Sequence, residues 1–246
     1  MPDLTVSYPV PYTCQFASPE LVHAFLHGER ALETDPNWAA YGASSPQEYA
    51  HWALRACGVV CVKMAVEGLT GQRAGPAMDW VRAGLAADGY LTEQRPDRPV
   101  EKGWKHTALA RLARDHGLHA CLISELALSD LVAHIRADRV IIASVTSELG
   151  EDGPLTRRSG HLVLVTGVAI DGKGGAVEAV IVHNPSGRTP DLQANARIPA
   201  ARFAQGFSGR GIVIGSGQGP HIAPPPEPGS SGSRLRRPGR PSSALP

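Results

Sequence analysis

We predict an α+β fold for residues 1–216 from three observations. Apolar side chains recur at helical spacing through the first half of the sequence. After Gly117 the pattern shifts to short runs that are typical of strands. Two of these runs are joined by the glycine-rich segment DGKGG, which suits a hairpin turn. The sequence therefore predicts N-terminal helices packed on an antiparallel sheet.

Five segments of the first half carry helix signals. Pro19 follows a potential N-cap, Ser18, and Ser45 and Glu48 have the spacing of a capping box. The later segments end at glycines, as helices commonly do. The predicted helices cover residues 19–32, 45–55, 58–68, 75–89 and 104–117.

The second half is predicted to be rich in strands, with one helix among them. Its segments are a strand at 119–124, a helix at 129–138, a strand at 139–145, and a hairpin of strands 160–170 and 176–184. Paired residues of a hairpin have position numbers with a constant sum. His161 and Asn184 add to 345, which centres the hairpin inside DGKGG and places these two side chains opposite each other on one face. His183 would then point to the other face.

The composition excludes several classes of protein. The 246 residues carry 24 Lys and Arg against 23 Asp and Glu, so the net charge of +1 indicates no nucleic-acid partner. The 4 cysteines are too few for a disulfide scaffold in a chain this long. The N-terminus lacks the pattern of a signal peptide, and no apolar run approaches the roughly 20 residues that span a bilayer. We therefore expect a cytoplasmic protein with reduced thiols and no membrane span.

Residues 217–246 differ from the rest because they consist mainly of Pro, Gly, Ser and Arg. Such a segment buries too little apolar surface to offset its ordering entropy, so we predict a disordered tail after a single domain, 1–216. The four arginines of the tail against Glu227 give a charge of +3, which leaves −2 for residues 1–216 out of the total of +1. The cluster RLRRPGR could bind phosphate or an anionic lipid, although such clusters are more often simply solvated.

Three polar residues have the chemistry of a thiol-dependent acyl transfer. Cys57 stands at the predicted start of a helix, whose free N–H groups would face the sulfur and lower its pKa. His161 could move the proton, and Asn184 across the hairpin could hold the imidazole by one ring nitrogen. The sequence therefore favours Cys57 as a nucleophile with His161 as its base.

Other interpretations of the cysteines and glycines are open. A cysteine beside an apolar helix is commonly a packing residue, and we interpret Cys61, Cys14 and Cys121 in this way. The C-x3-C spacing of Cys57 and Cys61 suggests a zinc site, but no second closely spaced pair completes four ligands. No glycine-rich segment joins a strand to a helix as a phosphate loop requires, so neither a metal nor a nucleotide cofactor is predicted.

Four short motifs resemble those of a known family. They are VPYTCQF at 10–16, CGVVCVKM at 57–64, GHLVLVTGV at 160–168 and HNPSG at 183–187. In this order they resemble the motifs of the bacteriocin-processing, double-glycine leader peptidases and their free-standing relatives, which are papain-like cysteine peptidases. The resemblance spans roughly residues 8–215 and implies a papain-like fold, in which the nucleophile helix packs against an antiparallel sheet that bears the histidine.

The resemblance also implies roles for individual residues. Cys57 matches the nucleophile, His161 the general base, Asn184 the residue that orients the histidine, and Gln15 the side-chain donor of the oxyanion hole. The family more often has aspartate where Asn184 stands. Gln15 precedes Cys57 by a longer gap than is usual, so residues 19–50 look like a helical insertion. His51, six residues before Cys57, stands where papain-like enzymes often have that glutamine, and it is the rival candidate for the oxyanion hole.

We accordingly predict a free-standing cysteine peptidase that acts on a peptide or protein substrate, needs no cofactor and has no transporter attached. Transfer of the acyl group to an amine, as in transglutaminase-like enzymes, and a catalytically silent peptide-binding domain are the alternatives. The expected walls of a substrate groove are the helical segment from about Ala74 to Arg98 and the insertion 19–50.

Overall fold

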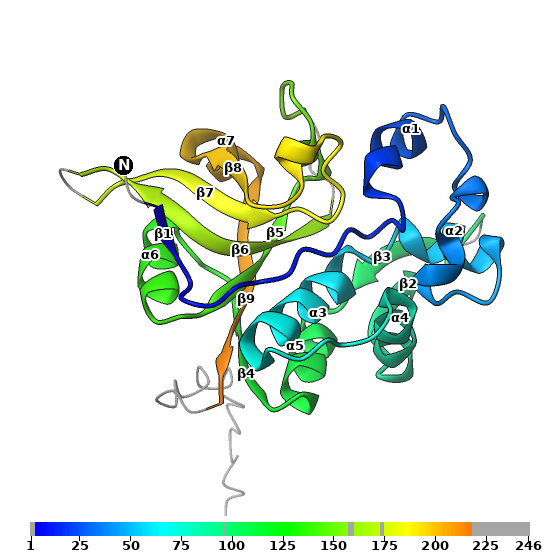
Figure 1. Ribbon diagram of the computed structural model, residues 1–246, viewed down its shortest axis with the longest axis horizontal. Coiled ribbons are helices and arrows are strands. Elements are labelled where there is room, and N and C mark those ends of the chain that lie inside the picture. Colours follow the sequence, from blue (N-terminus) through cyan, green and yellow to red (C-terminus); the bar gives the residue numbers. More distant parts are fainter. Residues whose placement is uncertain (1–2, 96, 157–159, 173–174, 218–246) are drawn as a thin grey trace, which may run out of the picture.

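The computed structural model describes residues 3–217 except 96, 157–159 and 173–174. The fold is α+β, as predicted: an antiparallel sheet is covered by helices, and the first four helices gather on one side of it (Figure 1). The predicted tail lies, apart from Gly217, outside the described residues.

The described helices and strands follow the predicted order. The helices are α1 (Val22–Leu26), α2 (Pro46–Ala53), α3 (Cys57–Thr70), α4 (Ala77–Ala86), α5 (His106–Asp115), α6 (Leu128–Arg136) and α7 (Ala200–Gly206). The strands are β1 (Asp3–Thr5), β2 (Tyr90–Glu93), β3 (Val100–Trp104), β4 (Leu118–Ile123), β5 (Val140–Val145), β6 (His161–Ile170), β7 (Val177–His183), β8 (Ala196–Pro199) and β9 (Phe207–Ser216). Short 3-10 turns cover Pro19–Leu21, Leu32–Thr34, Trp38–Tyr41, Ser147–Gly150 and Pro190–Leu192.

Within the described residues the main sheet has seven strands in the order β4-β9-β5-β6-β7-β8, with β1 added to β6. Every pairing is antiparallel. Strand β9, which the sequence did not predict, lies between β4 and β5. The last described strand thus joins β4 to the rest of the sheet. As a result, β5 and β6 are central strands, and their residues are almost all buried.

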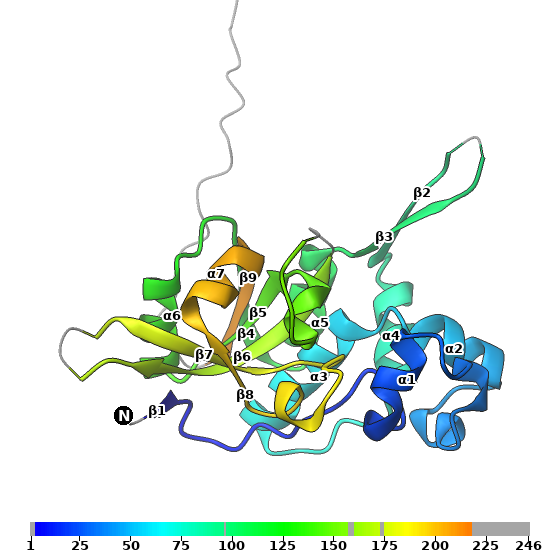
Figure 2. The same ribbon diagram turned by 90° about the horizontal axis from the view of Figure 1, so that it is seen from above.

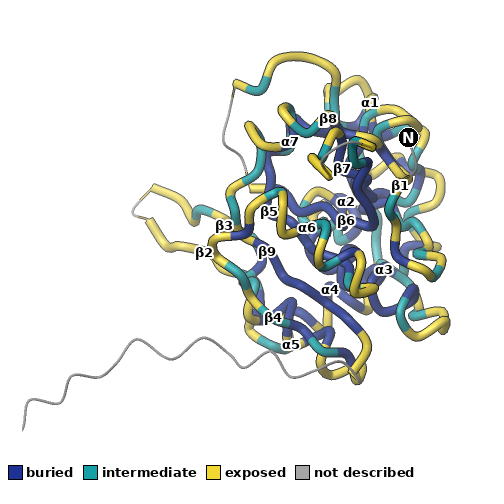
Figure 3. Tube along the Cα trace, turned by 90° about the vertical axis from the view of Figure 1, so that its left-hand side faces the viewer, coloured by how far each residue is buried: buried dark blue, intermediate teal, exposed yellow. Residues whose placement is uncertain are grey.

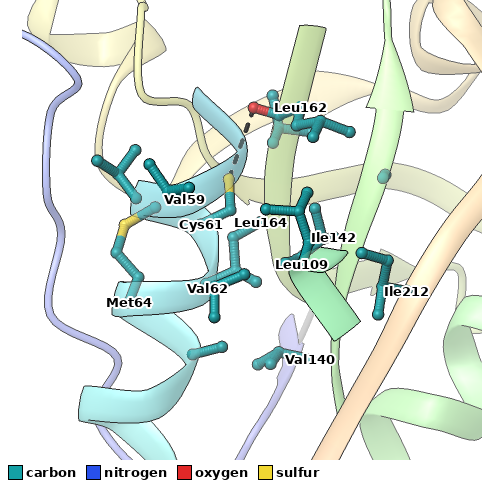
Figure 4. Close-up of a cluster of buried hydrophobic side chains, with 14 of the residues drawn as sticks. Val59, Cys61, Val62, Met64, Leu109, Val140, Ile142, Leu162, Leu164 and Ile212 are labelled. Atoms are coloured by element: carbon teal, nitrogen blue, oxygen red, sulfur yellow. Dashed lines mark hydrogen bonds between the residues drawn. The ribbon is translucent and has the colours of Figure 1, made fainter. Parts of the chain in front are cut away.

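Helix α3 is the core helix against this sheet. All residues from Gly58 to Gly68 are buried, and the helix packs on Leu162, Leu164 and neighbouring apolar side chains (Figure 4). A Cβ on Gly58 would lie 2.9 Å from both Leu109 and Leu162, so the glycine allows these side chains to approach the helix backbone closely. Cys61 is fully buried in this cluster, which confirms its interpretation as a core residue.

The predicted helix 19–32 is wrong in length, because α1 ends at Leu26 and Gly28 adopts a left-handed φ of 74°. Ser18 does not cap it: its hydroxyl donates to Asp35 Oδ1 at 2.6 Å instead. The predicted capping box at α2 is half formed. Ser45 Oγ accepts from the Glu48 N–H at 3.1 Å, whereas the Glu48 carboxylate takes the N–H of Ser44.

The strands β2 and β3 form a separate hairpin, in a stretch that was partly predicted as helical. It projects from the body of the molecule (Figure 2), and most of its residues are exposed (Figure 3). Its base is anchored by Trp104, which is buried against Gly84 and donates its indole N–H to Arg55 O at 2.6 Å. The hairpin is therefore fixed at one end and solvated at the other.

Candidate functional site

A cavity of about 680 Å³ lies where α3 begins and β6 begins. Cys57 and His161 both line it, so the two residues that the sequence proposed as a pair face one space. Its wall beyond them is formed by Tyr90 and Trp104 of the hairpin. Tyr90 lies in the predicted wall segment, whereas the described lining of this cavity includes no residue of the predicted helical insertion.

The position of Cys57 follows from the way β7 ends. The last residue of β7, His183, pairs with Leu164. On the edge of β6 that faces β7, the backbone of Leu162 is therefore left without a strand partner. Helix α3 takes that place. The Leu162 N–H points at the Cys57 sulfur, and Leu162 O accepts from Cys61 Sγ at 3.6 Å (Figure 4). The thiols of Cys57 and Cys61 therefore both bond to the backbone of Leu162, the residue that follows His161, and hold the start of α3 beside it.

The imidazole of His161 is held by two groups. Asn184 Oδ1 accepts the Ser186 N–H at 3.1 Å, so this oxygen is an acceptor, and His161 Nε2, 2.9 Å from the same oxygen, must carry the proton. Ser186 Oγ lies 3.2 Å from the same Nε2 and is a second acceptor. Nδ1 of His161 remains for the cavity. All three residues are buried.

Burial sets the protonation of both central groups. Together with the smaller effect of the nearby Arg188 charge, burial lowers the pKa of His161 to about 4, while the Asn184 hydrogen bond opposes the shift. Burial also raises the pKa of the Cys57 thiol to about 11, although the N–H groups of Leu162 and Gly58 oppose this shift. The expected lowering of the thiol pKa by the helix start is thus outweighed, and at pH 7 the structure favours a neutral thiol beside a neutral imidazole. Among the described residues, no hydrogen bond joins the Cys57 sulfur to the His161 ring.

The N-terminal segment runs along the other side of the Asn184 turn. Tyr12 Oη donates to Asn184 O at 3.0 Å, and Cys14 Sγ donates to Pro185 O at 3.1 Å. The Gln15 N–H donates to the same Pro185 O at 2.9 Å. The first and last of the four motifs, which are far apart in the sequence, are therefore hydrogen-bonded to each other. Cys14 is buried in this contact, as expected of a packing residue.

Gln15 and His51 have different environments. Gln15 is buried, and its side-chain amide donates to Ala53 O at 2.8 Å, so it bridges the Pro185 turn and the segment that precedes Cys57. Its Oε1 is buried without a partner among the described residues. His51 lies on the exposed side of α2, 3.9 Å from a Glu101 carboxylate oxygen, and does not line the cavity with Cys57. Gln15 does not line that cavity either, but of the two residues it is the one that contacts both the Pro185 turn and the segment before Cys57.

A second thiol lies beside an imidazole, because Cys121 Sγ is 3.8 Å from the His119 ring nitrogens, but neither residue lines the cavity with Cys57. Among the described residues, no group of His, Cys, Asp and Glu side chains is placed to hold a metal ion. None of the described helices has the length and apolar character that a membrane span needs. His183 faces away from His161, as predicted: its Nε2 donates to Val10 O at 2.8 Å and its Nδ1 accepts from the Asn195 N–H at 3.0 Å.

Ser186 is the residue of the site that the sequence did not reveal. The signal was present in the hairpin arithmetic, because Leu164 and His183 pair and their numbers add to 347, as do those of His161 and Ser186. The predicted sum of 345 was wrong by two residues, and bulges shift the pairing again towards the turn. A shift of two preserves the face of every side chain, so Asn184 still reaches His161 as a diagonal neighbour.

No family model and no curated protein matches this chain. Several solved structures are similar to it, and three of them follow. A protein described as a C39-like peptidase from Bacillus anthracis has a TM-score of 0.45 and 15% identity over 65% of this chain and 88% of that chain. A double-glycine-motif protease from an AMS/PCAT transporter, in complex with the leader peptide, has a TM-score of 0.38 and 15% identity over 64% and 82%. The peptidase domain of Streptococcus ComA has a TM-score of 0.40 and 13% identity over 66% and 93%. Likeness at this level says nothing of activity, so the function has to be argued from the residues.

Proposed function

We propose that this protein is a papain-like cysteine peptidase in which Cys57 is the nucleophile, His161 the general base and Asn184 the residue that orients the base. The observation that carries the proposal is the fixed tautomer of His161. With Nε2–H bonded to Asn184 Oδ1 at 2.9 Å, the basic Nδ1 is left for the cavity that Cys57 also lines.

The mechanism starts from neutral groups. As the Cys57 sulfur attacks a peptide carbonyl, its proton passes to Nδ1 of His161, and an S–C bond forms while the carbonyl oxygen becomes an oxyanion. His161 then gives this proton to the leaving amine as the C–N bond breaks. Water attacks the resulting thioester with His161 again as base, which restores the thiol and releases the acid. Asn184 and Ser186 accept from Nε2–H throughout and stabilise the transient imidazolium.

The oxyanion needs donors near the sulfur. The Cys57 N–H at the start of α3 is one, because the first N–H groups of a helix have no partner within the helix. Gln15 is the second: one proton of its amide is used by Ala53 O, which leaves the other for the oxyanion. The bridging position of Gln15 is what supports this role over one for His51.

One observation favours a second candidate, a peptide-binding domain without catalysis. A thiol whose pKa is raised to about 11 is a poor nucleophile unless His161 removes its proton. The two candidates therefore differ in whether His161 is coupled to Cys57.

The first experiment is alkylation of each cysteine by iodoacetamide at pH 7, measured by mass spectrometry in the wild type and in His161→Ala. If His161 acts as the base, the variant loses most of the reactivity of Cys57, while Cys121, which does not line the cavity, reacts as before. An unchanged rate at Cys57 would favour the silent binding domain.

The second experiment is cleavage of a proteome-derived peptide library by the wild type, Cys57→Ala and the matched control Cys121→Ala. We expect Cys57→Ala to abolish cleavage and to keep its thermal unfolding transition, and Cys121→Ala to cleave normally. Cleavage by Cys57→Ala would refute the proposal. An added amine that appears in the products would indicate acyl transfer in place of hydrolysis.

A further inference from the structure

A second cavity, of about 420 Å³, adjoins the one that contains Cys57 and His161. The two cavities share three lining residues, Ser144, Gly160 and Arg210, so they form one groove with a junction at these residues. From the junction the second cavity continues along the segment from Gln205 to Ser208. A substrate bound at Cys57 that extends in this direction must pass Arg210.

Arg210 is placed at the junction by an irregular strand pairing. β5 and β9 are in register from Val140 to Ala143, and the register then shifts before Val145 pairs with Phe207. Ser144 on β5 and Arg210 on β9 stand within this interruption of the pairing. Such irregularities redirect side chains at a sheet surface. The position of Arg210 is thus fixed by two central strands and not by a loop.

The other basic residues of the groove are already paired. Arg55 forms an ion pair with Glu101, Lys102 with Glu93 at 2.9 Å, and Lys105 with Asp88 at 2.8 Å. Arg210 is exposed and has no ion pair with any residue that the structure describes. It is also the one charged residue among the described residues that line the second cavity. Its positive charge is therefore free for a ligand.

The first cavity keeps one positive charge although the domain as a whole is acidic. Its described lining has four Lys and Arg side chains, and three of them are paired with carboxylates, so the charge of Arg210 is left over, whereas residues 1–216 carry a formal charge of −2. The neighbouring His106 adds no charge at pH 7, because burial and the Arg210 charge lower its pKa. Walls of low dielectric strengthen the field of an unpaired charge inside such a groove.

We propose that Arg210 is a carboxylate-binding subsite of the groove, so that the protein selects peptides with an acidic group on one side of the bond that Cys57 attacks. The planar guanidinium can donate two parallel N–H bonds to one carboxylate. The carboxylate belongs either to an Asp or Glu side chain or to the C-terminus of the peptide, and both present the same chemistry. This inference rests on the proposed function.

The test compares two alkylating reagents of nearly equal size, anionic iodoacetate and neutral iodoacetamide. Both react with the same Cys57 thiolate, so the ratio of their rates cancels the pKa of the thiol and reports the charge of the groove. We expect Arg210→Glu to lower the iodoacetate-to-iodoacetamide ratio about tenfold. Arg210→Gln should give an intermediate ratio, and this variant keeps the test informative if the charge reversal impairs folding.

The matched control is Arg136→Glu. Arg136 is an exposed residue of α6 that lines neither cavity, so the same change of net charge there should leave the ratio unchanged. An equal fall of the ratio in Arg136→Glu, or no fall in either Arg210 variant, would overturn the subsite. If Cys57 reacts with neither reagent in the wild type, the proposed function itself fails, which is a different result.

Peptides then distinguish the two sources of the carboxylate. Peptides cleaved by the wild type are remade with each Asp or Glu changed to its amide and, separately, with an amidated C-terminus. Loss of about tenfold in kcat/KM with the side-chain change assigns an acidic residue, and loss with the amidated end assigns the terminus. Either loss should vanish in Arg210→Gln. Equal loss in Arg210→Gln and the wild type would refute the assignment.

Discussion

The two sides of the groove are held in opposite ways. On the histidine side, buried side chains are fixed by hydrogen bonds of 2.9 to 3.2 Å among His161, Asn184 and Ser186. The other side is the β2–β3 hairpin, whose outer residues are exposed and joined by surface ion pairs such as Lys102–Glu93. Only its base, at Trp104, is buried.

This difference suits the two tasks of the proposed catalytic groove. Proton transfer depends on the orientation of one ring, so the groups around that ring need to be held rigidly. A wall that contacts different substrates can be exposed and locally adaptable. The histidine side also joins segments from both ends of the domain, since Tyr12 bonds to Asn184 O, whereas the hairpin pairs only with itself.

In the β2–β3 hairpin, substitution at the base should lower the free energy of unfolding more than substitution at the exposed end. Trp104→Ala removes a buried ring that fills the space over Gly84 and Gly58, and we expect it to lower the free energy of unfolding by about 3 kcal/mol. Urea denaturation measures this. Glu101→Gln, which removes the partly exposed ion pair with Arg55 and the 3.9 Å contact with His51, should cost less than about 1 kcal/mol. Equal effects of the two changes would contradict the division of the hairpin into an anchored base and a solvated end.

A substitution beside His161 should lower the activity and leave the fold intact. Asn184→Ala removes the acceptor that fixes the tautomer of His161, so we expect kcat/KM for a cleaved library peptide to fall about 100-fold. The far-ultraviolet circular dichroism should be unchanged. A loss of less than about threefold would mean that Asn184 does not orient the base.

The pH dependence of stability tests the low pKa of His161. Because the pKa of folded His161 is about 4 and its ordinary value is 6.5, the folded state binds fewer protons at this residue than the unfolded state. Its contribution is complete above pH 6.5 and is lost as the pH falls towards 4. Between pH 6.5 and 4.5 we expect the wild type to lose about 2 kcal/mol relative to His161→Gln, measured by urea denaturation. Parallel stability curves for the two proteins would refute the low pKa.

The smallest effect expected is that of Ser186. Ser186→Ala removes the second acceptor at Nε2 and leaves the Ser186 N–H bond to Asn184, so kcat/KM should fall about tenfold. If the hydroxyl stabilises the imidazolium, the loss should be smaller in the Asn184→Asp background, where a carboxylate supplies that stabilisation. Additive losses in the double variant would show that the two residues act independently.

The sequence was sufficient for the elements whose signals are local. The helix that starts at Cys57, the strands around DGKGG and the turn at Ser45 each depend on neighbours within a few positions, and the structure has them close to the predicted bounds. The contact of His161 with Asn184 was also predictable, because the error of two residues in the register left both side chains on the same face.

The sequence could not show what depends on distant segments. The β2–β3 hairpin has short, largely exposed strands, and it is held by Trp104 and Tyr90, whose rings pack against each other and against helix residues such as Gly84 and Trp52. Strand β9 is inserted between β4 and β5, and no local pattern specifies such a neighbour. Arg210 stands in the groove only because of that insertion.

The sequence by itself therefore determined the fold class and the candidates for the chemistry: a thiol at a helix start, a histidine at a strand start and an amide beyond the hairpin. Their protonation, the different surroundings of Gln15 and His51, the contact of Ser186 with His161 and the place of Arg210 in the groove became visible only in the folded chain. The physical reason is that periodicity and turns act over a few residues. Burial, and with it the pKa values of Cys57 and His161, is set by every segment that packs around the site.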